Sequence, residues 1–279
     1  MSQYRSAKAV YSAKIEFKVK KISTADVWQA VRLGWKDFML QPSHYFFTVV
    51  LYPFIGFVLY FGVAGESTIR LLFPMLAGFA LIGPFVALLL YEISRRLEQG
   101  LDTSWRQVFS AMKSPALPAI LTLGLMLAGL FMAWLITANL LYVLVYGPVY
   151  PLSLIDFVKE VVTTPRGWLL IVLGNGLGFC FALLAFCTTV VAFPLMLEHQ
   201  VGALCGIQAS LQAVRVNPVP LFLWGGVICL GLFLATLPFL MGLIIVLPVF
   251  GHATWHIYRK VLFFPVQQGN PPKNGCVEN

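Results

Sequence analysis

The richest group of chemistry-bearing side chains lies near the C-terminal end, in residues 251–259. His252 and His256 are four residues apart, so they share one face of a helix. Such a pair can hold a metal ion, but a usable site needs further ligands from elsewhere in the chain. The alternative is a pair of histidines that hydrogen-bond to carbonyls or to water. Both interpretations stay open from the sequence.

Two glutamates occupy related positions earlier in the chain. Three apolar stretches each carry a late proline, at Pro84, Pro194 and Pro248. Four and eight residues further on, about 6 and 12 Å along a helix, most positions hold an ionisable residue. Ionisable groups at the edge of the hydrocarbon are costly unless they pair or reach water. We therefore predict a polar cluster where these stretches converge. Its members are Glu92, Glu198, His252 and His256. Separate snorkelling of the four side chains to the headgroups is the alternative.

Catalytic motifs are missing from the sequence. No glycine-rich loop follows a strand pattern, and Gly174, Gly176 and Gly178 fall inside an apolar run, where small residues favour close helix packing. No two cysteines form a CxxC pair. We therefore expect neither enzymatic activity nor a cofactor.

The composition indicates an integral membrane protein. Of 279 residues, 59% are hydrophobic and 11% are charged, whereas a soluble domain carries about 25% charged residues. Crossing the hydrocarbon takes about 20 apolar residues. Suitable stretches are 44–63, 68–91, 116–145, 167–196 and 219–258. The last is either one long helix or two short ones, 219–236 and 238–258, divided at Pro238, because a proline disfavours helix in the residue before it.

Charge distribution decides between five spans and six. Basic loop residues stay on the cytoplasmic side of a membrane. With six spans, 16 of the 19 Lys and Arg residues share one side with both termini. With five, Arg259 and Lys260 fall on the opposite side. We predict six spans, in a bacterial cytoplasmic (inner) membrane, with both termini cytoplasmic.

Each predicted hairpin is preceded by a short amphipathic stretch that ends before a proline. The first begins at Ser23 and Asp26, which resemble a capping box, and continues with Val27, Val31, Trp35 and Phe38. The second follows Asp102, with Trp105, Val108, Phe109 and Met112, and the third contains Leu204, Ile207, Leu211 and Val214. We predict an all-α bundle of six transmembrane helices as three hairpins. Each hairpin follows a short amphipathic helix on the cytoplasmic surface.

The chain ends and the helix ends complete the predicted architecture. A basic flexible tail at 1–21 precedes a single membrane domain at 22–262, and a second flexible tail covers 263–279. Ser153 and Asp156 favour another short surface helix on the outer side. Aromatic and basic residues at helix ends anchor helices at the headgroups. The predicted anchors are Trp35, Tyr91, Arg95, Arg96, Trp255 and Arg259.

Several motifs resemble those of a bacterial membrane family catalogued as domain of unknown function 2189. They are the runs at 30–35, 78–84, 91–96 and 251–259, and the resemblance covers roughly residues 22–262. It implies a polytopic inner-membrane protein without an assigned activity. Some members carry the label of a cytochrome c oxidase subunit I. The four histidines of this chain are too few for the haem and copper ligands of an oxidase core, which number about six.

Three functions fit these observations. The first is a non-catalytic accessory, assembly or scaffold protein. The alternatives are a small-solute or ion transporter, and a metal-binding redox protein using His252 and His256. Anionic lipid headgroups are expected partners of the basic N-terminus, which contains Lys14, Lys18, Lys20 and Lys21. A membrane protein partner fits the first function, and topology alone explains the positive charge without nucleic acid.

Overall fold

The structure is a computed structural model of residues 1–279. It describes residues 16–41, 69–75, 87–110, 114–148, 153–238 and 241–265. The first predicted span, 44–63, and half of the second, 68–91, lie outside the described residues. Within them, three helical stretches are long and apolar enough to cross a membrane: Leu117–Tyr146, Pro165–His199 and Pro218–Thr236.

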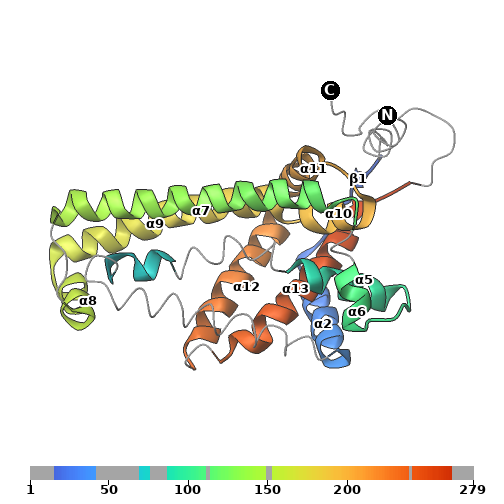
Figure 1. Ribbon diagram of the computed structural model, residues 1–279, viewed down its shortest axis with the longest axis horizontal. Helices are drawn as coiled ribbons and strands as arrows, with labels where there is room; N and C mark the ends of the chain where they lie inside the picture. The colour runs from blue at the N-terminus through green and yellow to red at the C-terminus, as the bar shows by residue number, and fades with distance from the viewer. Residues whose placement is uncertain are drawn as a thin grey trace. The chain divides into compact units, whose positions relative to one another are not determined.

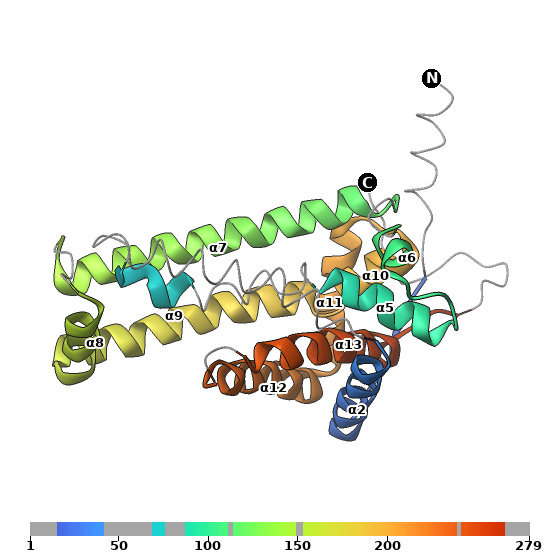
Figure 2. The same ribbon diagram turned by 60° about the horizontal axis from the view of Figure 1, so that its bottom comes forward.

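The described elements group into two compact units. The first contains β1 (Lys18–Val19), α2 (Thr24–Leu40), α5 (Leu88–Glu98), α6 (Trp105–Ser110), α10 (Ala192–His199), α11 (Ala203–Val216), α12 (Pro218–Thr236), α13 (Leu243–Val261) and β2 (Leu262–Phe263). The second contains η1 (Ile69–Leu71), α8 (Leu154–Thr163) and most of α7 (Leu117–Tyr146) and α9 (Pro165–Thr189). Figures 1 and 2 colour these elements along the chain.

The closest helix packing in the first unit joins α2 to α13, which lie side by side in both views (Figures 1 and 2). Gly34 makes this approach possible, because a Cβ there would come within 2.6 Å of the backbone at Ala253 and Val249. Ser23 caps α2 as predicted: its side chain accepts from the Asp26 N–H, and Asp26 accepts from the Ser23 N–H. The capping box of the sequence is therefore confirmed.

The buried face of α2 differs from the predicted stripe. Its buried residues are Val27, Ala30, Gly34 and Asp37, whereas Trp35 of the predicted stripe is 48% exposed. The small side chains face α13 because they allow the two backbones to approach. The larger apolar side chains of α2 are left on its outer surface.

Each short helix of the first unit packs on an element that ends one of the predicted hairpins. Helix α6 contacts α5, α11 contacts α10, and α2 contacts α13. In α11 the buried face again consists of small residues, with Gly206 against Ala192 and Met196, while Leu204 of the predicted stripe is 64% exposed. The last apolar stretch divides into α12 and α13, so the predicted break at Thr236–Pro238 is confirmed.

The two ends of the first unit are joined by a short antiparallel pairing. Lys18 pairs with Phe263 and Val19 with Leu262. The Asn217 side chain adds to this, because it accepts from the Ile22 N–H at 2.8 Å and donates to the Lys20 carbonyl at 2.9 Å. The prediction of flexible tails at 1–21 and 263–279 is therefore wrong at their inner ends. Cross-strand backbone pairing over so long a sequence distance left no local signal.

The second unit is built from apolar helices. Trp134 of α7 lies against Gly178 of α9, and its Nε1 donates to the Pro74 carbonyl at 2.9 Å. Ser153 caps helix α8, because its side chain accepts from the Asp156 N–H, so the predicted short helix is confirmed. Most large apolar side chains here are exposed, including Leu144 at 82% and Phe179 at 66%. Such surfaces are stable in lipid rather than in water.

Candidate functional site

The C-terminal half of α13 is the hub of the polar contacts in the first unit. Gly251 lets α5 approach, because a Cβ there would meet the Leu90 side chain at 2.2 Å. The helix continues through Pro248 without ending. Its polar residues then divide between two sides. His252 and His256 face one group of partners, and Trp255, Tyr258 and Arg259 face another.

The first group, here named the Asp37 cluster, consists of Asp37, Ser94, His252 and His256. Oδ2 of Asp37 accepts a hydrogen bond from Oγ of Ser94 at 2.6 Å and lies 2.8 Å from Nε2 of His256. Oγ of Ser94 also lies 2.8 Å from Nδ1 of His252. Three helices, α2, α5 and α13, thus meet at one carboxylate oxygen and one hydroxyl.

Burial makes these contacts costly to break. Ser94 and His252 are fully buried, and Asp37 is 7% exposed. The His256 side chain is the most exposed member, at 14%. A buried polar group that loses its partner pays its full desolvation cost. The cluster therefore fixes the relative placement of α2, α5 and α13.

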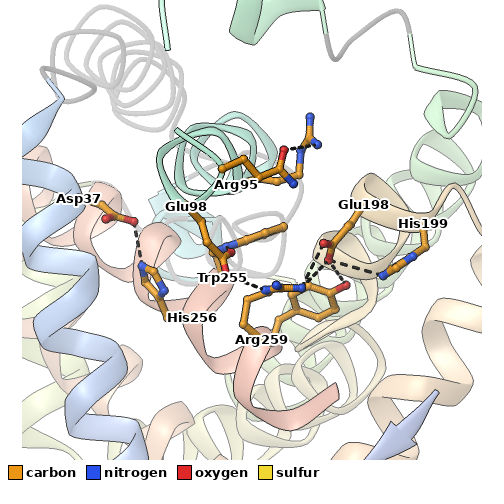
Figure 3. A network of polar contacts seen from close by, with 10 residues as sticks. Asp37, Arg95, Glu98, Glu198, His199, Trp255, His256 and Arg259 are labelled. Atoms are coloured by element: carbon orange, nitrogen blue, oxygen red, sulfur yellow. Dashed lines mark hydrogen bonds and ion pairs between the residues drawn. The ribbon is translucent and has the colours of Figure 1, made fainter. Parts of the chain in front are cut away.

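The second group, here named the Arg259 cluster, joins α13 to α5 and α10 (Figure 3). Arg259 pairs with Glu98 of α5 at 3.0 Å and with Glu198 of α10 at 3.1 Å. Nε1 of Trp255 donates to Glu98 at 3.1 Å, and the Tyr258 hydroxyl donates to Glu198. His199 also lies near Glu198, with Nε2 3.6 Å from the carboxylate. The Arg259 cluster is thus a charged clamp made by three helices.

Glu92 belongs to neither cluster. Its side chain is 1% exposed and is paired with Arg95 at 2.7 Å and with Arg96 at 2.6 Å, within α5 itself. Two guanidinium groups compensate the buried carboxylate, as a buried charge requires.

The structure brings together the segments that follow the three prolines, because α5, α10 and α13 contact one another. The partners within this region differ from the predicted ones. His252 and His256 bond to Ser94 and Asp37, Glu92 bonds to arginines, and Glu198 bonds to Tyr258 and Arg259. Sequence reasoning missed Asp37 and Ser94. A signal was available for Asp37, which continues the helical spacing of Val27, Ala30 and Gly34.

The predicted headgroup anchors are also placed by the structure. Tyr91 is 3% exposed and Trp255 is fully buried, so neither reaches a lipid-facing surface and that prediction is wrong for both. The periodicity that put them at a helix end could not show that other helices cover that end. Arg95, Arg96 and Arg259 are engaged in ion pairs. Trp35 is about half exposed, and its role as an anchor stays a prediction.

The Asp37 cluster contains the residue types of a hydrolase triad in a different order. In a triad the histidine stands between the serine and the carboxylate, whereas here Ser94 stands between His252 and Asp37. The hydroxyl is also fully buried. Within the described residues, no three His, Cys, Asp or Glu side chains come together as metal ligands. The arrangement is suited to holding the three helices together rather than to nucleophilic attack.

An exposed ion pair lies on the other end of the α2–α13 contact. Asp26 accepts from Nζ of Lys260 at 2.8 Å. This bond, together with those from Ser23, lowers the pKa of Asp26 from 3.8 to about 2.

Comparison with known families gives a match over the middle of the chain. The family described as predicted integral membrane protein (DUF2189) matches residues 72–198. This is a shorter stretch than the resemblance over 22–262, and it lends no support to the oxidase label. No curated protein matches, and no solved structure matches. The three apolar helices of membrane-spanning length among the described residues agree with the description of the family. The chain is thus an integral membrane protein whose residues 72–198 match the model of the DUF2189 family.

Proposed function

We propose that the chain crosses a bacterial inner membrane six times, as three hairpins with both termini in the cytoplasm. The packing of α6 on α5, α11 on α10 and α2 on α13 supports this architecture. In a threefold repeat, each short helix would pack on the end of the preceding hairpin. Helix α2, which comes before the first hairpin, would then occupy the position that follows the third. The β1–β2 pairing would join the start of the repeat to its end.

Reporter fusions test this topology. A reporter fused after Asn279 is expected to be active in the cytoplasm, and one inserted near Ser153 is expected to be active in the periplasm. Basic residues near the helix ends hold this orientation. A periplasmic C-terminus would contradict the six-span arrangement.

Within this architecture the chain serves as a non-catalytic accessory, assembly or scaffold protein. The observation that carries the proposal is the Arg259 cluster, in which the polar side chains of α13 are used to join α5 and α10. A catalytic site aims its polar groups at a ligand. Here the charged and polar side chains of α13 bond to other helices of the same chain. These bonds hold the helices in fixed positions, which supports a role in presenting a rigid surface to a protein partner.

The test uses the full chain, crosslinked in living cells and purified in mild detergent. We expect one membrane protein to be recovered in fixed proportion to the chain. The variant Arg259→Gln is expected to lose this partner, because Glu98 and Glu198 are then left without their shared cation. The variant Glu160→Gln, which changes an exposed carboxylate of α8, is the matched control and is expected to keep it. Equal recovery from both variants would contradict the proposal.

A small-solute or ion transporter is the second candidate, and the Asp37 cluster favours it. Ionisable residues buried among membrane helices mark ion and proton pathways in other proteins. Purified chain in liposomes loaded with a pH-sensitive dye separates the two functions. A proton or solute flux above that of protein-free liposomes, lost in Asp37→Asn, would support transport and contradict the scaffold role.

Lipid contact at the N-terminus is part of the same proposal. Lys18 is the first residue of β1 and Lys20 follows the strand, with Nζ of Lys20 4.1 Å from the centre of the Phe263 ring. Each basic residue near an anionic surface contributes about 1 kcal/mol to its attraction. We expect the membrane-embedded chain to enrich anionic lipids around it, and we expect Lys18→Gln with Lys20→Gln to reduce that enrichment in native mass spectra.

A further inference from the structure

The exposed side of α2 combines large apolar side chains with basic ones. Trp28, Trp35 and Met39 are exposed there, and Arg32 and Lys36 are exposed beside them. Positions 28, 32, 35 and 39 follow one another at helical spacing, so their side chains share one side of the helix, with Lys36 at its border. These five residues are here named the outer face of α2.

The opposite side of α2 is taken up by helix packing. Its buried residues are Val27, Ala30, Gly34 and Asp37, and the elements that α2 contacts are α13, α12 and α5. Among the described elements, α2 lies at the edge of the first unit in both views (Figures 1 and 2). The outer face therefore points away from the helices that hold α2 in place.

The outer face carries positive charge without a compensating carboxylate. Helix α2 has two acidic residues, and both are engaged by α13: Asp26 pairs with Lys260, and Asp37 is buried in the Asp37 cluster. In the described part of the chain, no carboxylate forms an ion pair with Arg32 or Lys36. A surface that complements this face has to offer negative charge next to apolar material.

The chain connects this face to a membrane boundary. Helix α2 ends at Leu40, and the sequence predicts that a membrane span begins at residue 44. Helix α2 also contacts α12, one of the candidate spans. Tryptophan is enriched where a membrane meets water, because its ring is apolar and its N–H is polar. The position of α2 in the chain thus agrees with the residue types on its outer face.

The division of charge on the outer face favours lipid over protein as its partner. At 100° per residue, Arg32 and Lys36 lie on the same side of the line through Trp28, Trp35 and Met39. A helix in the membrane interface has this division, with its apolar side in the acyl boundary and its basic side toward the headgroups. Lysine is depleted in protein–protein interfaces.

We propose that the outer face of α2 binds anionic phospholipids of the membrane that holds the chain. Trp28, Trp35 and Met39 lie at the upper ends of the acyl chains, and Arg32 and Lys36 bind phosphate groups above them. Arginine offers a phosphate two parallel N–H donors, and lysine offers a point charge. The inference rests on the proposed topology in one respect, that α2 lies beside a bilayer. It adds a lipid site separate from the lysines of β1.

Brominated lipids test the apolar part of this site in the full chain in nanodiscs. Bromine on an acyl chain quenches the tryptophans that lie close to it. With all lipids brominated, Trp28→Phe together with Trp35→Phe is expected to remove emission that bromine quenches strongly. The matched control is Trp224→Phe, which removes a fully buried indole whose Nε1 has no hydrogen-bond partner among the described residues. That variant is expected to remove emission that bromine quenches much less.

The result that would overturn the proposal is equal quenching of the emission lost in the two variants. The outer face would then be shielded from the acyl chains, as it would be under a protein partner. Because both substitutions keep an aromatic ring and break no hydrogen bond among the described residues, the comparison is made on folded chains, and thermal unfolding checks this.

A second pair of nanodiscs tests the anionic part of the site. Equal amounts of phosphatidylglycerol and phosphatidylcholine are used, and only one of the two lipids is brominated in each. We expect the two tryptophans to be quenched more by brominated phosphatidylglycerol. Arg32→Gln together with Lys36→Gln is expected to reduce this preference about fivefold or more, since each basic residue near an anionic surface strengthens its attraction by about that factor. The matched control, Lys159→Gln with Arg166→Gln, removes equal charge from exposed positions of the second unit and is expected to keep the preference.

An unchanged preference in Arg32→Gln with Lys36→Gln would overturn the assignment of anionic lipid. Neither quenching measurement depends on which side of the membrane α2 occupies or on whether a protein partner is recovered. Reporter fusions and crosslinking decide those two questions, so a failure of the lipid site is distinguishable from a failure of the proposed topology or scaffold role.

Discussion

Helices α13 and α9 are both rich in apolar residues, yet they satisfy their polar groups in different ways. In α13, His252 is fully buried and bonds to Ser94 of another helix. In α9, Asn175 is exposed and donates to the Ile171 carbonyl of its own helix at 2.8 Å. A polar group satisfied within its own helix places no demand on neighbours. The contrast teaches that α13 specifies its partners residue by residue, whereas α9 needs mainly an apolar surface.

The largest expected difference in stability is between alanine substitutions at a glycine packed on α13 and at a glycine of α9. Gly34→Ala places a Cβ 2.6 Å from the α13 backbone, which cannot move as a flexible side chain can. We expect a loss of about 3 kcal/mol or more in the free energy of unfolding. Gly176→Ala in α9 meets nothing within 4 Å and should be neutral or stabilising by about 0.5–1 kcal/mol. SDS unfolding measures both, and a tolerated Gly34→Ala would refute the close contact of α2 with α13.

A buried and an exposed carboxylate should also differ in their contribution to the free energy of unfolding, by a somewhat smaller amount. Glu92→Gln leaves Arg95 and Arg96 without the buried charge that pairs with both. Breaking a buried pair by removing one partner costs about 3 kcal/mol. Glu160→Gln on the exposed surface of α8 should change the free energy of unfolding by less than about 0.5 kcal/mol. Similar losses in the two variants would show that burial of Glu92 does not matter.

A buried hydroxyl bonded to another segment should contribute more to stability than an exposed hydroxyl bonded within its own helix. Ser210 of α11 is fully buried, and its Oγ accepts from the Val191 N–H at the break between α9 and α10. Ser210→Ala leaves that buried donor unpaired, which should cost about 1–3 kcal/mol. Thr137→Ala in α7 removes an exposed hydroxyl that bonds to the Ala133 carbonyl of its own helix. Its effect on thermal unfolding should be close to zero, and equal shifts in the two variants would contradict the distinction.

Local features of this fold could be predicted from the sequence. The N-caps at Ser23 and Ser153 depend on residues three apart, so their signal is complete within a few positions. The break after Thr236 likewise follows from Pro238 and the geometry of the preceding residue. These signals need no knowledge of neighbouring helices.

The partners of the site could not be predicted in the same way. The Arg259 cluster joins residues from three helices, and periodicity places a residue on a face without naming what that face meets. The stripe chosen for α2 followed the large apolar residues, as suits a soluble surface helix. In a membrane protein the small residues mark the packed face, and on α2 they lead through Ala30 and Gly34 to Asp37.

The smallest expected effect concerns the exposed ion pair between α2 and α13. Asp26 and Asp156 each lie three residues after the serine that caps their helix. Among the described residues, Asp26 forms an ion pair with a lysine, Lys260, and Asp156 does not. The folded-state pKa of Asp26 is lowered from 3.8 to about 2. Its contribution to stability is therefore present above about pH 4 and is lost as the pH falls through about 2.

Solvent reduces the size of this contribution. The side chains of Asp26 and Lys260 are 32% and 23% exposed, and exposed pairs contribute about 0.2–1 kcal/mol. Asp26→Asn should lower the free energy of unfolding by about 1 kcal/mol or less at about pH 7, and by almost nothing at about pH 2. Asp156→Asn changes the corresponding carboxylate of α8, which accepts from the Ser153 hydroxyl, and should cost less at about pH 7. If both variants lose the same amount there, the Lys260 pair adds nothing to the packing of α2 on α13, and that contact rests on Gly34 and the Asp37 cluster alone.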